Sequence, residues 1–528
     1  MRWPREKERA TLAGQRLYTL ALCLLVCLGF ALSLRLLDRF PLREDEAIYS
    51  VWALHFWQQD PFFLTVWPDK PPLFLWTLAL IFEWWGATPA AGRLLNIMLT
   101  LLTALVIGAT ARRLWGKPSA LLATTLYLLN PFAMSFAPTV YTDPMLVFAG
   151  QLALWLALTG RSLGAGLWLA VAIMTKQQGL FYVPLIGLVL WRGQPTRAHR
   201  GHWFALGALL VLVPIFYWDS LRWAVAPSPW DLGVRNYGAL QLVAPGEWLA
   251  RSRGWAGLLW YFTASWSGWW LVAASLVAAA GYGLRSNWPL GRQYFALASD
   301  SPILWLTSWG AGFLLLHNVT TIQVWDRYLL PLVPIFCLLV TWSVCQWGRG
   351  LAAVASRWLW LGTLLGLLWL LPPAVTASAG GWPIGGDHGA YGGLAAALAW
   401  LQQQPAAHAI LYEQKLGWQY EFYLYNQLAS GAYERRWFPS AVSLADNAAK
   451  TPYRTRWLLQ PDWDPQPLLA LHLAVRQLAL VPQARFDRLT IYTIENQAQA
   501  PCDWCLCQPR VDWQTIPTPA LVLAQGQP

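Results

Sequence analysis

The chain has 528 residues, of which 56% are hydrophobic and only 12% are charged, and its mean hydropathy is +0.37. Soluble globular proteins carry about 25% charged residues, so this composition excludes an ordinary soluble domain and indicates an integral membrane protein. The net charge of +11 would suggest a nucleic-acid partner in a soluble protein. In a membrane protein, basic inner loops explain much of it, and anionic lipid phosphates are a further explanation.

The first apolar segment follows a basic N-terminus, MRWPREKERATLAGQR, and runs over about 17–37. It is longer than the apolar core of a secretory signal peptide, and no small-residue cleavage site follows it. We therefore predict a retained first span whose basic end lies in the cytoplasm. Further segments of roughly the length that a bilayer needs bring the number of candidate spans to about eleven: 93–111, 119–138, 143–160, 162–176, 179–191, 203–219, 256–283, 302–318, 327–347 and 357–374.

The loops then divide by charge between the two sides of the membrane. With the N-terminus inside, the inner loops are short and basic, for example ARRLWGKP and WRGQPTRAHRGH, as the positive-inside rule requires. Most of the carboxylates in this part of the chain fall instead in outer loops or at the outer ends of spans. This distribution suggests acidic chemistry on the outer face.

Two outer loops are long, at about 38–92 and 219–255. The first contains EAIYSVWALHFWQQ, with apolar residues at helical spacing, and then PPLFLWTLALIFEWWG. Both segments predict helices that lie on the membrane surface with Trp anchors. The 38 Trp residues favour interfacial belts, and the alternative for some outer Trp and Tyr residues is stacking on sugars or prenyl chains.

The character of the sequence changes at about residue 375, where ASAGGWPIGGDHGAYGG forms a glycine-rich linker. A helix-like LAAALAWLQQQ, a strand-like AILYEQ and the segments EFYLYNQ, TRWLLQP and RLTIYTIEN follow. This alternation predicts a small α/β domain over 375–528, after a mainly α, polytopic transmembrane domain over 1–374. An odd number of spans places the C-terminal domain outside the cell membrane.

The seven cysteines fall into two groups. Those in apolar runs are predicted to be inert packing residues: Cys23, Cys27, Cys337 and Cys345. The other three, Cys502, Cys505 and Cys507, form CDWCLC near the C-terminus. No fourth metal ligand lies nearby in the sequence, so a disulfide is favoured over a metal site if this tail lies in an oxidising compartment.

Three carboxylates at the outer side are candidates for catalysis. Asp45 and Glu46 lie in PLREDEAIYS, where an Asp fits a helix N-cap and a Glu fits the first turn. Asp143 lies in YTDPML, where it fits an N-cap with Pro144 at the first helical position. Capping does not exclude catalysis, because the same carboxylate can face an acceptor, and an ionisable residue at membrane depth indicates a functional site.

The basic candidates lie in the same outer segments. Asp69 and Lys70 precede two prolines in VWPDKPP, so the backbone is extended and rigid there. Lys70 fits a phosphate ligand, and the alternative is an interfacial lysine with a buried stem. Lys176 lies between two apolar runs in TKQQG, and Arg327 in VWDRY fits either a pair with Asp326 or bidentate phosphate binding. The lone His55 and His317 are predicted to be hydrogen-bonded side chains rather than metal ligands.

These candidates converge on one face: Asp45 and Asp143 are acidic, and Lys70, Lys176 and Arg327 are basic. Together they suit transfer from a phosphorylated donor, in which a carboxylate deprotonates a hydroxyl and cations stabilise the departing phosphate. The alternatives are a transporter or flippase of lipid-linked sugars and an inactive sugar-lipid binding scaffold. Transporters often carry internal repeats, and none is visible in this sequence.

The ordered segments REDEAIYSVWA, PDKPPLFLWTLALIFEWWG, AGRLLNIMLTLLTALVIGATARRLWG, NPFAMSFAPTVYTDPMLVF, AIMTKQQGLFYVP and DRYLLPLVP resemble membrane-embedded GT-C glycosyltransferases. The resemblance covers about 15–350. It is strongest to dolichyl-phosphate-mannose protein mannosyltransferases and to the aminoarabinose transferases that modify lipid A. It implies a GT-C fold, a polyprenyl-phosphate sugar donor and an active site on the outer face.

The resemblance also assigns roles. It implies that Asp45 is the essential carboxylate, that Lys70 and Arg327 contact the lipid phosphate, and that Asp143 is the second carboxylate. Lys70 matches the Lys of the acidic-Lys-Pro motif of the aminoarabinose transferases, although the acidic residue here is Asp69 and the second Pro differs. Some relatives bind a divalent metal ion near the first loop, which makes Asp69 a candidate ligand.

We add Glu46 as a secondary catalytic candidate and Lys176 as a further phosphate ligand. The expected enzyme is an inverting hexosyl- or pentosyltransferase of the cell envelope. It would reside in the inner membrane, among membrane lipids, with a glycolipid, glycan or protein acceptor and no nucleic-acid partner.

Overall fold

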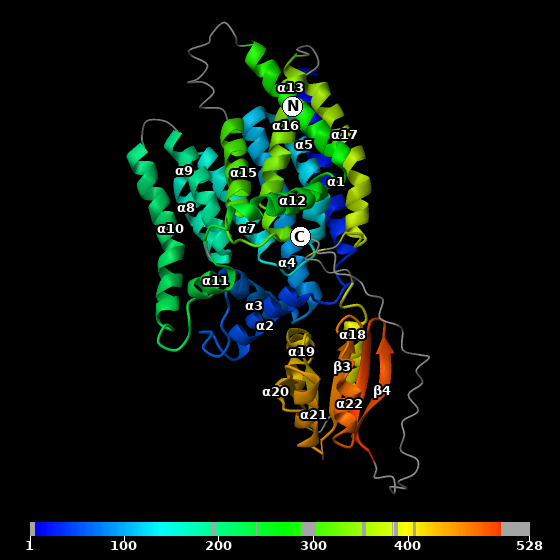
Figure 1. Cartoon of the computed structure of the whole chain (residues 1–528). Helices are drawn as coiled ribbons and strands as arrows, with labels where there is room; N and C mark the ends of the chain where they lie inside the picture. Colours follow the sequence, from blue (N-terminus) through cyan, green and yellow to red (C-terminus); the bar gives the residue numbers. More distant parts are fainter. Residues whose placement is uncertain are drawn as a thin grey trace, which may run out of the picture. The chain divides into compact units, whose positions relative to one another are not determined.

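The computed structural model describes residues 6–192, 197–238, 240–286, 302–350, 355–382, 384, 389–404, 408–452 and 454–497 (Figure 1). The fold is mainly helical with one small sheet, as the sequence predicts. The chain divides into two compact units, Met1–His388 and Gly389–Pro528, and each is described by itself. Cys502, Cys505 and Cys507 lie outside the described residues.

Most of the predicted spans appear in the first unit as helices. Four described helices are long and apolar enough to cross a membrane, judged by length and composition: Gln15–Leu34, Pro89–Trp115, Gly201–Ser220 and Leu359–Ser378. The helices of this unit are α1 (Glu6–Leu34), α2 (Glu44–Gln58), α3 (Leu73–Trp85), α4 (Pro89–Trp115), α5 (Lys117–Leu128), α6 (Pro131–Phe136), α7 (Asp143–Leu158), α8 (Ser162–Thr175), α9 (Tyr182–Arg192), α10 (Arg197–Ser220), α11 (Pro229–Tyr237), α12 (Trp248–Leu259), α13 (Trp266–Ser286), α15 (Pro302–Val319), α16 (Leu332–Gly350) and α17 (Ala355–Ser378). Short 3-10 turns connect some of them: η1 (Gln177–Phe181), η2 (Pro245–Glu247), η3 (Trp260–Phe262) and η5 (Asp326–Leu329).

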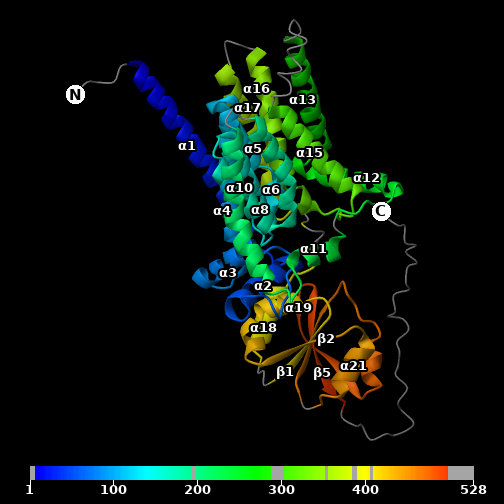
Figure 2. The same cartoon turned by 90° about the vertical axis from the view of Figure 1, so that its left-hand side faces the viewer.

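The two helices expected in the first outer loop are present as α2 and α3, and both views show them lying across one end of α4 (Figures 1 and 2). Their caps differ from the prediction. Arg43, not Asp45, occupies the N-cap of α2, because Glu46 reaches back to the Arg43 amide and closes a capping box. Thr142 occupies the N-cap position of α7 without a side-chain capping hydrogen bond, and Asp143 lies in the first turn. Asp45 and Asp143 therefore do not cap their helices, whereas Glu46 takes part in the capping box of α2.

Two predicted spans are each divided in the structure. The segment 119–138 breaks at Asn130, whose side chain accepts hydrogen bonds from the amides of Phe132 and Ala133 and so starts a new helix at Pro131. The segment 256–283 is divided between α12 and α13 by η3 and by Ala264, whose φ of 56° lies in the left-handed region. In both views α12 runs across the direction of α15 (Figures 1 and 2).

Helices α8 and α10 pack closely through glycines. A Cβ at Gly166 would lie 1.9 Å from the carbonyl oxygen of Phe204, and a Cβ at Gly207 would lie 1.9 Å from that of Leu163. Only glycine permits this backbone approach, which is a common way of packing helices in membranes. These contacts lie in the first two turns of α8, at the end of this helix opposite Lys176.

The second unit is a five-stranded sheet in the order β2-β1-β3-β5-β4. Strands β1, β2 and β3 are parallel to one another, and β5 pairs antiparallel with β3 and β4. Figure 2 shows α18 and α21 on opposite faces of this sheet, and alternate residues of β1 enter the two cores. The elements are β1 (Ala409–Glu413), β2 (Tyr433–Trp437), β3 (Arg456–Pro461), β4 (Leu478–Phe486), β5 (Leu489–Asn496), α18 (Leu394–Gln402), α19 (Gly417–Tyr423), α20 (Tyr425–Ala429), α21 (Ala441–Ala449) and α22 (Leu469–Ala474).

We predict that Gly207→Ala destabilises the protein by about 1–3 kcal/mol, the usual cost of overpacking a close contact. The matched control is Gly201→Ala on the same helix, where a Cβ would meet nothing within 4 Å. Thermal unfolding in detergent compares the two variants with the parent. Equal midpoints for Gly207→Ala and Gly201→Ala would contradict the close α8–α10 packing.

Candidate active site

The candidate site contains an ion pair between Asp45 of α2 and Arg327 of η5. Asp45 lies in the first turn of α2, and its side chain is 34% exposed. Arg327 lies in η5, where its amide donates a 2.7 Å hydrogen bond to Asp326. Its guanidinium carbon lies 4.7 Å from the ring centre of Trp325 and 5.2 Å from that of Tyr141, within the range of cation–π attraction. The aromatic rings thus hold the guanidinium against Asp45.

A second pair forms where the chain enters α3. The Lys70 ammonium is 3% exposed and donates to Asp69 at 2.8 Å and to the Tyr237 hydroxyl at 2.9 Å. Tyr237 in turn donates to Asp69 at 2.6 Å, and the Asn236 amide donates at 3.3 Å. Because Tyr237 and Asn236 lie in α11, these contacts tie the segment between α10 and α12 to the segment between α2 and α3.

The environment shifts the pKa of both members of this pair. Burial lowers the pKa of Lys70, although the adjacent carboxylate of Asp69 opposes the shift. Burial also disfavours the charged form of Asp69, but the Lys70 ammonium and the hydrogen bonds from Tyr237 and Asn236 outweigh it and lower the pKa of Asp69. Each member of the pair thus favours the charged form of the other.

A third pair lies deeper, between α7 and the end of α8. Lys176 donates a 2.6 Å hydrogen bond to Asp143, and both side chains are buried. Helix α8 ends before Lys176, whose backbone is extended between α8 and η1. Its side chain therefore does not follow the helical pattern of α8. Its ammonium also lies 4.4 Å from the ring centre of Tyr328, next to Arg327 in the sequence.

These pairs place three cations within electrostatic range of one another: Lys70, Lys176 and Arg327. Lys70 and Lys176 line a pocket of about 280 Å³ that also contains the apolar side chains of Leu180, Phe181 and Val234. Because like charges repel, the three cations need negative partners. Carboxylates supply these in the absence of a ligand, and an anionic ligand would be favoured in the same place. A charged end and an apolar wall suit an amphipathic anion.

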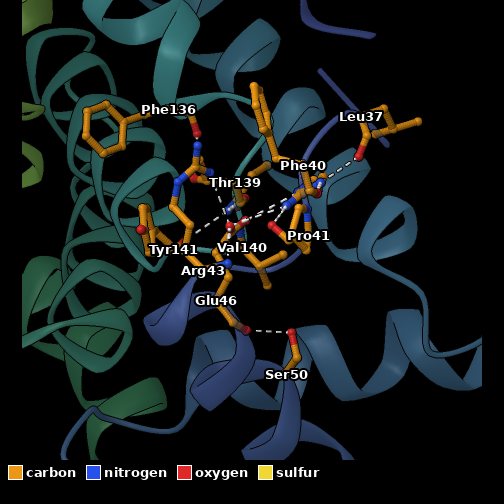
Figure 3. A network of polar contacts seen from close by, with 12 residues as sticks. Leu37, Phe40, Pro41, Arg43, Glu46, Ser50, Phe136, Thr139, Val140 and Tyr141 are labelled. Carbon is orange, nitrogen blue, oxygen red and sulfur yellow. Dashed lines mark hydrogen bonds and ion pairs between the residues drawn. The ribbon is translucent and has the colours of Figure 1, made fainter. Parts of the chain in front are cut away.

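Glu46 lies in a separate network, shown in Figure 3. Its side chain is fully buried and accepts hydrogen bonds from the Val140 amide at 2.9 Å and from Arg93 at 3.3 Å. Arg93 also donates to the carbonyl oxygens of Leu37, Phe40 and Pro41. Burial disfavours the charged form of Glu46, but Arg93 and Arg43 outweigh it and lower the pKa of this carboxyl. The network fixes the backbone on both sides of Asp45.

The structure thus brings together five sequence candidates in three ion pairs, with Asp69 as a sixth member: Asp45, Lys70, Asp143, Lys176 and Arg327. His317 is hydrogen-bonded through both ring nitrogens, to the Phe313 carbonyl at 2.7 Å and to Gln178 at 2.9 Å. Sequence reasoning missed Tyr237, Arg93 and Gln178. The polar run TKQQG between two apolar segments was a usable signal for Gln178.

The donor set around Asp69 does not fit a metal ion. Its two carboxylate oxygens accept hydrogen bonds from Lys70, Tyr237 and Asn236, and one of these donors is itself a cation. Among the described residues, no group of three or more His, Cys, Asp or Glu side chains gathers in a metal-binding arrangement. We therefore derive no chemical step through a metal ion, and the predicted role of Asp69 as a ligand stays a prediction.

Residues 69–218 match the family model of dolichyl-phosphate-mannose-protein mannosyltransferase. This segment contains two of the three ion pairs, Lys70 with Asp69 and Lys176 with Asp143. A search of curated proteins finds no match.

Three solved structures share the fold. ArnT from Cupriavidus metallidurans in the apo state has a TM-score of 0.63 at 16% identity, covering 92% of this chain and 98% of that chain. The same protein bound to undecaprenyl phosphate has a TM-score of 0.59 at 17% identity, covering 89% and 97%. The Archaeoglobus fulgidus oligosaccharyltransferase in complex with Zn and sulfate has a TM-score of 0.51 at 12% identity, covering 90% and 73%. The resemblance drawn from the sequence motifs is confirmed.

We predict that Arg93→Ala destabilises the first unit by about 3–5 kcal/mol, because it leaves the carboxylate of Glu46 buried without its main partner. The control is Arg113→Ala at the exposed C-terminal end of the same helix, α4. Thermal unfolding in detergent is measured for both variants. A midpoint for Arg93→Ala that matches Arg113→Ala would show that the network in Figure 3 contributes little.

Proposed function

We propose that the protein is an inverting glycosyltransferase that moves a sugar from a polyprenyl-phosphate donor to a hydroxyl acceptor. The transfer takes place at the extracytoplasmic face of the inner membrane. One observation carries this proposal: three cations, each paired with a carboxylate, lie within electrostatic range of one another, and two of them, Lys70 and Lys176, line a partly apolar pocket. The acceptor is a glycolipid, glycan or protein.

The pocket supports the choice of donor. Lys70 and Lys176 supply the charged end for a phosphate, and Leu180, Phe181 and Val234 supply an apolar wall for the start of a prenyl chain. The similarity in fold to ArnT, which has been solved bound to undecaprenyl phosphate, supports the same choice. A phosphate entering here competes with Asp69 and Asp143 for the two lysines.

Exposure supports Asp45 as the general base. Its side chain is 34% exposed, whereas those of Glu46 and Asp143 are almost completely buried. An acceptor hydroxyl arriving from outside can therefore reach Asp45 without rearrangement of the core. In this proposal Asp143 positions Lys176, and Glu46 positions the segment that carries Asp45.

The proposed reaction is a single displacement. The acceptor oxygen forms a bond to the anomeric carbon while the bond from that carbon to the phosphate oxygen breaks. The acceptor proton passes to Asp45, and the bonding electrons leave with the polyprenyl phosphate. Arg327, Lys70 and Lys176 stabilise the charge that develops on the departing phosphate, and the attack from the opposite side inverts the anomeric centre.

The transporter alternative gains no support from the family match or from the fold comparisons. A labelled polyprenyl-phosphate sugar, offered to the purified protein in vesicles with a hydroxyl acceptor, separates the two functions. An enzyme consumes the donor and releases polyprenyl phosphate, whereas a flippase moves the intact donor between leaflets.

We predict that Asp45→Asn lowers the transfer rate by about 10²–10⁴-fold, because the amide cannot accept the proton of the acceptor. Glu44→Gln, which changes the exposed neighbouring carboxylate, is the control. Turnover of the labelled donor is measured together with thermal unfolding, so that a folded inactive variant is distinguished from an unfolded one. Parent-like turnover by Asp45→Asn would remove Asp45 from the mechanism.

We predict that donor affinity falls with rising pH at a lower pH than ordinary lysine titration would give. The lowered pKa of buried Lys70 means that its ammonium is lost, as pH rises, below the ordinary lysine value of about 10.4. Lys70→Arg keeps its charge throughout this range and should move this loss to higher pH, at the cost of weaker binding at every pH. Donor KM is measured against pH, with the exposed Lys415→Arg as control. Identical profiles for the parent and Lys70→Arg would exclude Lys70 from phosphate binding.

A further inference from the structure

The segment that leads to Arg327 is held by the second outer loop. It runs from the end of α15 at Val319 to Trp325 and has no regular structure apart from one bridge. That bridge pairs Leu242 with Thr320 in antiparallel fashion. On either side of it, the Val243 amide donates to the Val319 carbonyl at 3.0 Å and the Thr321 amide donates to the Gln241 carbonyl at 2.9 Å.

Arg251, in α12, completes this attachment. Its guanidinium donates to the carbonyl oxygens of His317 and Asn318, each at 2.9 Å, and to that of Ile322. The carbonyls of 317 and 318 belong to the last turn of α15, where helix geometry leaves carbonyl groups without intrahelical partners. A cation at this end also interacts favourably with the helix dipole. One side chain therefore joins the end of a helix to the loop that follows it.

The distance along the chain from this clamp to the site is short. Ile322 precedes Arg327 by five residues. Between them the chain forms a turn from Gln323 to Trp325 and then enters the 3-10 turn η5. Trp325 contacts the Arg327 guanidinium, and Gly254 of α12 lies against Val324. A shift of the segment at Ile322 is therefore transmitted to Arg327 and to its contact with Asp45.

We propose that Arg251 is a positioning residue for the transfer reaction: it sets the place of Arg327 relative to Asp45 and to the departing phosphate. This inference rests on the proposed function, because it assigns Arg251 an effect through Arg327. A guanidinium suits the role because its rigid fork spans several carbonyl groups at once, which a lysine ammonium does not do with the same geometry.

The test compares Arg251→Ala and Arg251→Gln with Arg253→Ala, an exposed arginine on the same helix. Displacement of a transition-state contact by about 1 Å costs about 100-fold in rate, so we expect kcat to fall by up to about 100-fold in Arg251→Ala. Donor KM should change less than kcat, because Lys70 and Lys176 remain in place. Arg253→Ala should match the parent in both constants.

A double-mutant cycle with Arg327→Lys separates positioning from general stability. If Arg251 acts through Arg327, adding Arg251→Gln to Arg327→Lys costs much less activity than it does in the parent. Unchanged kcat in Arg251→Gln overturns the inference, and so do additive losses in the cycle. If Arg251→Ala fails to fold, Arg251→Gln, which keeps an amide donor, carries the same comparison.

The outcome is distinguishable from failure of the proposed function. If Asp45→Asn and Arg327→Lys both turn over the donor like the parent, the proposed function fails whatever Arg251 does. If those variants are impaired and Arg251→Gln is not, the proposed function stands and the positioning role alone is overturned.

Discussion

The buried contact between Glu46 and Arg93 is the constraint on which the candidate site depends. Glu46 closes the capping box that starts α2, accepts from the Val140 amide and pairs with Arg93, which in turn binds three carbonyl groups of the preceding segment. A buried carboxylate is costly unless it is paired and hydrogen-bonded, and here the segment before α2, helix α4 and the segment before α7 supply the partners of Glu46. The next residue on one side is Asp45, which is therefore held at the edge of the site by its neighbour.

The site itself balances an excess of charge. Three cations lie within electrostatic range, and each has a carboxylate partner: Lys70 with Asp69, Lys176 with Asp143 and Arg327 with Asp45. Each carboxylate opposes the desolvation of its cation, and an anion that offers stronger contacts can replace these carboxylates. The tyrosine rings of Tyr237 and Tyr328 support two of these ammonium groups without adding negative charge.

Much of this could be predicted from the sequence, because charged residues beside long apolar runs stand out. The mainly helical fold, the two helices of the first outer loop and the small C-terminal sheet region followed from hydrophobic patterning and turn residues. The pairings did not follow. Arg327 was expected to meet Asp326 or a phosphate, yet its side chain reaches Asp45, 282 residues away. Arg93, Tyr237 and Arg251 were missed, since their partners include backbone groups or residues in distant loops, and such contacts leave no pattern in a single sequence.

The separation of Asp45 from Arg327 has a consequence for how the protein is made. Asp45 precedes most of the apolar helices of the first unit in the chain, whereas its partner Arg327 follows most of them. During synthesis the Asp45 carboxylate is therefore present before the Arg327 guanidinium that pairs with it. A nascent chain that stops before η5 lacks the contact between Asp45 and Arg327. This ion pair of the site therefore forms only when most of the first unit has been made.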